Sequence, residues 1–110
     1  MMILTVHLKV PPEKRLDALK TIHSVIGQTA VQPGCLGCEL FNSTQNDDNL
    51  LLQEKWQSRE DLNRHVKTPE FRKIMVTMDL ACEPPDISFI ECGLPEGMDL
   101  VEKILGDVEG

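Results

Sequence analysis

The chain has 110 residues, of which 41% are hydrophobic and 26% are charged, a composition typical of a single globular domain and unlike a disordered chain. The formal net charge is −7 and the aromatic residues are three Phe and one Trp, so a phosphate-binding surface and a base-stacking platform for nucleic acid are both disfavoured. Residues 1–82 are neutral overall, and residues 83–110 carry the whole negative charge. This acidic segment is expected to be a solvated tail. The alternatives are a tail that repels anionic ligands and one that docks on a basic partner.

Neither a targeting signal nor a membrane segment is visible. Residues 1–10 contain no basic region followed by a small-residue cleavage site, and no apolar run approaches the length of a membrane helix. The four Cys come without a secretory signal that would suggest a disulfide scaffold. The protein is therefore expected in the cytoplasm, with reduced thiols and no membrane partner.

The first half of the chain predicts a strand, a helix and a second strand. Residues 3–10 alternate in the way that gives a strand two distinct faces, with Leu4 and Val6 on the more apolar one. Pro11 and Pro12 end this strand and start a helix that stops before residues 33–34. The apolar stripe expected on this helix consists of Leu16, Leu19, Ile22, Ile26 and Ala30. Residues 35–43 form the next predicted strand.

The second half predicts a hairpin, a broken helix, a fourth strand and a short helix. The polar turn at 46–49 joins strands 35–43 and 50–57. Ser58 begins a helical region, and Thr68 followed by proline is a second start signal that breaks it. Its expected apolar stripe consists of Leu62, His65, Val66, Phe71, Ile74, Met75 and Met78. Residues 86–92 are the fourth strand, and an amphipathic helix follows near residues 100–105.

The order β-α-β-β-α-β predicts an α+β, ferredoxin-like fold over residues 3–92, with an antiparallel four-stranded sheet. Residues 93–110 are then an acidic C-terminal extension with a short helix. Both helical regions cover one face of such a sheet, and strands one and four carry apolar residues on both faces. Because an open apolar face needs a cover, we expect a homodimer in which a second copy supplies it.

Three motifs carry a resemblance to a known family. A Pro-Gly-x-x-Gly sequence at 33–37 begins the second strand, Trp56 ends the third strand, and the helical His65 precedes a Thr-Pro pair. Together with the order of elements, this pattern resembles the antibiotic biosynthesis monooxygenase domain family. The resemblance implies a dimeric α+β barrel. For several members it also implies monooxygenase or quinol oxidase activity without a cofactor, acting with O₂ on a small aromatic or quinol substrate.

His65 is the candidate catalytic residue, as a base or hydrogen-bond partner for a substrate hydroxyl. The alternative is a packing histidine bonded to the backbone. The candidate substrate-binding residues are Trp56, His7, Met75 and Met78. For Trp56 the alternative is a core anchor, and the two Met residues are expected in the core unless they line a cavity. His7 lies on the less apolar face of the first strand and is expected to point into the cavity or the dimer seam.

Two further features concern Glu54 and the cysteines. Glu54 shares a strand face with Trp56, so if that face is buried the carboxyl must be paired or protonated. The expected outcome is a salt bridge across strands or at the dimer interface. Cys35 and Cys38 form a CxxC motif that enters a strand rather than a helix. Residues three apart on a regular strand point to opposite faces, so a metal or disulfide site is disfavoured. A thiol-based sensor that uses Cys35 or Cys38 is therefore a weaker hypothesis than the enzyme and the non-catalytic module described next.

Two branches of the family fit this sequence poorly. The haem-degrading branch has an Asn in the first strand, which residues 1–10 lack, and His65 and Met75 occupy its Trp and haem-ligand positions. The polyketide-quinone branch has an Asn where Leu50 and Leu52 stand. The leading hypothesis is a cofactor-free enzyme with a closed apolar cavity that His65 reaches. The alternative is a non-catalytic dimeric module that binds a small hydrophobic ligand or a protein, with a filled cavity and His65 turned to a backbone carbonyl.

Overall fold

The computed structural model describes the backbone of residues 1–109 and the side chains of residues 1–107. It contains four strands and four helices, and the helical region after the hairpin is divided in two. In chain order the elements are β1 (Met2–Lys9), α1 (Pro12–Ala30), β2 (Cys35–Asn42), β3 (Asn49–Trp56), α2 (Arg59–Val66), α3 (Pro69–Met78), β4 (Asp86–Glu91) and α4 (Met98–Glu109).

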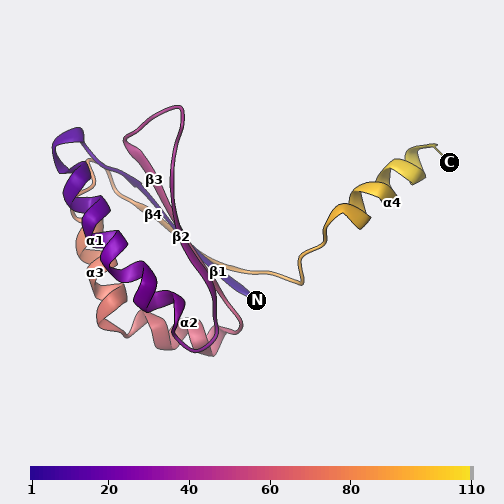
Figure 1. Cartoon of the computed structure of the whole chain (residues 1–110), viewed down its shortest axis with the longest axis horizontal. Coiled ribbons are helices and arrows are strands. Elements are labelled where there is room, and N and C mark those ends of the chain that lie inside the picture. Colours follow the sequence, from indigo (N-terminus) through magenta and orange to yellow (C-terminus); the bar gives the residue numbers. More distant parts are fainter. Residues whose placement is uncertain (110) are drawn as a thin grey trace.

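The four strands form one antiparallel sheet in the order β2-β3-β1-β4. Helices α1, α2 and α3 lie on one face of this sheet, and α4 stands apart beyond its end (Figure 1). This is the predicted ferredoxin-like arrangement, with an open face on the side away from the helices. No helix within residues 1–109 has the length and apolar character needed to cross a membrane.

The hydrophobic core lies between the sheet and α1, α2 and α3. Alternate residues of β1 and β3 point toward the helices, as their sequence pattern predicted. The large side chains buried in this core are Met2, Leu4, Val6, Leu8, Ile22, Leu50, Leu52, Trp56, Leu62, Phe71 and Ile74. The strand pattern is therefore a reliable guide to which residues can meet the helices.

The predicted stripes on α1 and on the α2–α3 region are partly wrong, and Val66 of α2 is 36% exposed. Leu16 is 62% exposed and Ala30 is exposed, whereas Ala18 and Val25 face the core. Leu16 lies two positions before Ala18, about 200° round the helix, and Ala30 follows the buried Thr29. On α3, Met75 is 52% exposed, since it follows Ile74 and so lies about 100° further round the helix.

Hydroxyl caps produce the predicted break between α2 and α3. The Ser58 hydroxyl accepts a hydrogen bond from the Asp61 backbone N–H at 3.2 Å, and the Thr68 hydroxyl accepts one from the Phe71 N–H at 3.4 Å. Each hydroxyl satisfies a backbone donor that the helix leaves free at its start. The first cap sets where α2 begins and hence which of its residues face the sheet.

Gly34 joins the end of α1 to the sheet in a conformation that favours glycine. Its φ is +83°, and its carbonyl accepts a hydrogen bond from the Gln57 N–H at 2.8 Å. A Cβ at this position would collide with the carboxylate of Asp61 in the first turn of α2. Only glycine allows the α1–β2 connection and α2 to approach this closely.

We expect Gly34→Ala to destabilise the protein by about 1–3 kcal/mol, because it adds backbone strain and a collision. The control is Gly27→Ala on the exposed side of α1, where a Cβ meets nothing within 4 Å. That change should stabilise the protein by about 0.5–1 kcal/mol through helix propensity. Urea unfolding measures the free energy of unfolding of both variants. If Gly34→Ala lowers it by no more than the size of the change in the control, the role assigned to Gly34 is wrong.

Candidate functional site

A buried polar cluster lies between β3 and α2. Strand alternation places Glu54 and Trp56 on the helix-facing side of β3, and the Ser58 cap places His65 on the sheet-facing side of α2. The Nε2 atom of His65 lies 2.9 Å from Oε1 of Glu54, and at most 1% of either side chain is exposed. The prediction that a buried Glu54 needs a partner is confirmed. The expected place of that partner, across strands or at the dimer interface, is wrong, because His65 approaches from α2 of the same chain.

Three further side chains surround the imidazole. The Trp56 Nε1–H donates to the same Glu54 oxygen at 3.1 Å, and the Trp56 ring stacks on His65 with centroids 4.6 Å apart. Phe71 and the imidazole pack in an edge-to-face arrangement, with their ring centroids 5.6 Å apart. On its other side, Nδ1 of His65 lies 2.9 Å from Oε1 of Gln32. The ring is thus held at both nitrogens and by aromatic contacts.

The two contacts of the imidazole differ in kind. The His65 Nε2 contact with Glu54 has ion-pair distance but not the alignment of a hydrogen bond, so its attraction is mainly electrostatic. Both ring nitrogens therefore face side-chain oxygens, Oε1 of Glu54 and Oε1 of Gln32. A turned Gln32 amide would present NH₂ to Nδ1 instead. The hydrogen-bonding partner on the Nδ1 side can thus change while Glu54 stays in place.

His65 is separated from solvent by Gln32. Four surface hollows are described within residues 1–109, and His65 lines none of them. The nearest is a hollow of about 220 Å³, lined by Gln32, Pro33, Asp61, Arg64 and Thr68. The enzyme hypothesis predicted a cavity that His65 reaches, but His65 lines none of the four hollows. The non-catalytic hypothesis predicted a contact with a backbone carbonyl, but both ring nitrogens face side chains.

The remaining candidate residues do not join His65. His7 is exposed on the open face of the sheet, in a separate hollow of about 220 Å³ with Phe41 and Leu51. Met75 points to solvent, and Met78 packs partly buried at the edge of the core. The predicted set of substrate-binding residues is therefore divided between two faces of the sheet.

Gln32 is the site residue that the sequence analysis missed. It lies in the connection after α1, 33 positions before His65, where no periodic pattern marks which side chains face inward. The only local signal is its place directly before the Pro-Gly turn at residues 33–34.

A β-bulge changes the geometry of the two nearby cysteines. The β2–β3 register shifts between Cys35 and Gly37, so Cys35 lies opposite Trp56 and Cys38 opposite Glu54. Both thiols therefore point toward the helices, and the expectation that they face opposite sides is wrong because Leu36 is an extra residue in the strand. Both are free. Within residues 1–109, no three His, Cys, Asp or Glu side chains gather in a way that could hold a metal ion.

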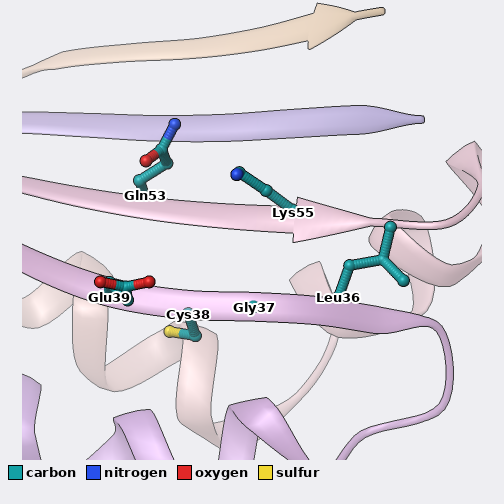
Figure 2. A pocket seen from close by; sticks show the side chains of 6 residues that line it. All are labelled: Leu36, Gly37, Cys38, Glu39, Gln53 and Lys55. Atoms are coloured by element: carbon teal, nitrogen blue, oxygen red, sulfur yellow. The ribbon is translucent and has the colours of Figure 1, made fainter. Parts of the chain in front are cut away.

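The surroundings of these thiols disfavour redox chemistry. Burial, followed by the negative charge of Glu54, raises the pKa of Cys38 to about 12. Burial is also the main cause that raises the pKa of Cys35. Figure 2 shows Cys38 on β2 beside Glu39, with Gln53 and Lys55 on the neighbouring strand. The hollow that these residues line has a volume of only about 60 Å³. A thiolate nucleophile is strongly suppressed at this place.

Comparisons with known proteins agree with this fold. The family model described as "Antibiotic biosynthesis monooxygenase" matches residues 1–77. Uncharacterized protein sll1783 of Synechocystis sp. is 27% identical over 82 residues, which are 74% of this chain, and this chain spans only 56% of that relative. A Bacillus subtilis protein named "Putative monooxygenase YcnE" is 25% identical over 79% of this chain and 93% of its own length. The crystal structure of a protein from Deinococcus radiodurans named "putative antibiotic biosynthesis monooxygenase" has a TM-score of 0.79 and 18% identity, covering 88% of this chain and 97% of that one.

Glu54→Ala should destabilise the protein by about 3–5 kcal/mol, because it leaves His65 and the Trp56 N–H buried without their acceptor. The control is Glu91→Ala, which removes an exposed ion pair with Arg59 at 3.9 Å and should cost no more than about 1 kcal/mol. Urea unfolding compares the two. Equal losses of unfolding free energy in the two variants would show that the buried contact stabilises the protein no more than the exposed ion pair.

Cys38 should react with iodoacetamide at pH 8 at least about 100-fold more slowly than the exposed Cys82, because little of it is thiolate. The reaction of Cys38 should accelerate as the pH rises toward 12. Peptide mass spectrometry resolves the two sites. Rapid modification of Cys38 at pH 8, or its rapid reversible oxidation by peroxide, would revive the thiol-sensor hypothesis.

Proposed function

Because this chain belongs to the antibiotic biosynthesis monooxygenase family, we propose that it is a cofactor-independent monooxygenase or quinol oxidase. Its substrates would be O₂ and a small dihydroxyaromatic compound or quinol. The observation that carries the proposal is the buried imidazole of His65, held between the Glu54 carboxylate and the Gln32 amide and stacked on Trp56. The name of the Bacillus relative supports the same class of reaction.

His65 would act as the base through its Nδ1 atom. In this role Glu54, 2.9 Å from Nε2, would favour the ring form that carries its proton there, so that Nδ1 would face the substrate. The carboxylate would then stabilise the imidazolium formed when the substrate proton arrives. Gln32 is half-buried and borders both Nδ1 and the neighbouring hollow. Rotation of its side chain would let a substrate hydroxyl approach Nδ1 from that hollow, while Glu54 and Trp56 stay fixed.

The substrate itself would be the reductant. After losing a proton to His65, it passes one electron to O₂, giving a substrate radical and superoxide. In a monooxygenase these two combine with a proton to form a hydroperoxide at carbon, which loses water and leaves a carbonyl. In an oxidase a second electron and the second proton follow, so that the quinol becomes a quinone and O₂ becomes H₂O₂. Exclusion of water protects the radical pair in either case.

A second candidate function is favoured by the position of His65 away from the four described hollows. A non-catalytic dimeric module, binding a small hydrophobic ligand or a protein, would need His65 only to fix α2 on the sheet. The observation behind it is that His65 lines none of the four described hollows. Such a module would bind ligands without consuming oxygen.

Both functions include a homodimer that covers the open face of the sheet. Apolar side chains on this face include Phe41, which is 43% exposed, and Ile90, which is 45% exposed. Ile90 pairs with Ile3 in the neighbouring strand, so the apolar area continues across β1 and β4. A second sheet packed on this area would bury it. The four free thiols support a reducing compartment such as the cytoplasm.

Oxygen uptake with a panel of quinols and dihydroxynaphthalenes, corrected for autoxidation, tests the proposal. The wild type should accelerate uptake with at least one compound, and a folded His65→Gln variant should lose about 100-fold or more of this rate. The control is Gln28→Ala, on the exposed side of α1, which should keep the wild-type rate. Added catalase returns half of the consumed O₂ if the product is H₂O₂ and none if oxygen enters the substrate.

Two results would count against this mechanism. If the folded His65→Gln variant consumes oxygen at the wild-type rate, His65 takes no part in the chemistry, although the protein is still an enzyme of this class. Ligand binding seen by NMR without any acceleration of uptake would favour the non-catalytic module.

A further inference from the structure

A groove runs along the outer side of α2, where the helix layer leaves β4 uncovered. Its volume is about 460 Å³, the largest of the four described hollows, and it is lined by Arg59, Asn63, Val66, Lys67 and Phe89. Arg59, Asn63 and Val66 of α2 and Lys67 at its C-cap recur at helical spacing, so they lie on the side of the helix away from His65. Phe89 is 49% exposed although it points to the helix side of the sheet. The groove is thus apolar at its floor, and its rim carries Lys67 and Arg59, the latter 3.9 Å from Glu91.

The C-terminal helix α4 has the complementary character. It stands beyond the end of the sheet and away from the three other helices (Figure 1). One side of it carries an apolar stripe, Met98, Val101, Ile104 and Leu105, of which every member is about half exposed or more. Its other side carries Asp99, Glu102 and Asp107 against a single Lys103. An amphipathic helix with no apolar partner is a typical ligand for a hydrophobic groove.

We infer that α4 of a second copy of this chain docks in the groove between α2 and β4. The apolar stripe would cover Val66 and Phe89, and the acidic residues would lie near Arg59 and Lys67 at the rim. The lengths match, because 12 helical residues span about 18 Å and the six residues of β4 span about 20 Å. The partner's helix would then lie against the same α2 that carries His65, and would hold this helix on the sheet.

The direction of the chain after β4 favours a second copy over the same chain. The Cys92 N–H still donates to the Met1 carbonyl at 2.8 Å, so the chain follows the sheet to this residue and then leaves it. Residues 93–97 lead outward to α4, and Leu94 among them is 92% exposed. In the structure these five residues carry α4 away from the groove of its own chain (Figure 1). Docking within one chain would need a reversal here, which connections of this length can make, so that arrangement is an outcome of the test below. A second copy meets α4 as it stands, and a two-fold arrangement makes the contact twice.

Hydrogen exchange of the full-length chain, read by mass spectrometry on α4 peptides, tests this inference with two defective variants. Phe89→Asp spoils the groove and leaves α4 intact, whereas Ile104→Asp spoils α4 and leaves the groove intact. The two α4 peptides differ in mass, so each chain is read separately in a mixture. In the wild type we expect α4 amides to be protected at least about tenfold over those of Phe89→Asp alone.

Mixing the two variants provides the decisive comparison. Added Ile104→Asp chains supply intact grooves, so the α4 peptide of the Phe89→Asp chains should regain protection. If wild-type α4 is protected and mixing restores nothing, the helix docks on its own chain and the inference is wrong. If wild-type α4 exchanges as fast as that of Phe89→Asp, no docking occurs. Lys103→Asp, on the polar side of α4, is the matched control and should keep wild-type protection.

Discussion

The contact between His65 and Glu54 is the interaction on which the site depends. It joins the sheet to α2 where at most 1% of either side chain is exposed, so the loss of one group would leave the other buried without its partner. Such a pair costs much of its attraction in desolvation, and its main effect is to fix one arrangement of strand and helix. The Ser58 cap and the tight approach at Gly34 serve the same arrangement, since both determine where α2 begins.

Much of the fold could be predicted because its signals are local. Strand alternation identified the buried faces of β1 and β3, and the hydroxyl caps marked the break at Thr68. The partnership of Glu54 could be anticipated as well, because an ionised carboxylate cannot be buried alone. The expected partner, across strands or at the dimer interface, was wrong, because the identity of the partner depends on how α2 packs across β3.

The errors have a common physical origin in contacts between distant segments. The bulge at Leu36 is a property of how β2 pairs with β3, and it turns both cysteines to one side. Gln32 reaches His65 from a connection without periodicity. Met75 and Leu16 are exposed because several stripes fit the apolar residues of their helices, and only the tertiary contact with the sheet selects the lines through Ile74 and Ala18. Phe89 is 49% exposed although it points to the helix side of the sheet.

The position of β4 at the margin of the sheet limits how copies of this chain can meet. Within residues 1–109, the outer backbone N–H and C=O groups of β4 pair with no further strand. Such an edge can pair with a strand of another molecule and lead to aggregation. Asp86 and Glu91 stand at its two ends. If two such strands paired head to tail about a two-fold axis, each Asp86 would oppose a Glu91, and the repulsion of like charges would weaken both ends of the junction. The acidic residues at both ends of β4 thus disfavour edge-to-edge pairing of two β4 strands. Association through the faces of the sheet is not affected by this repulsion.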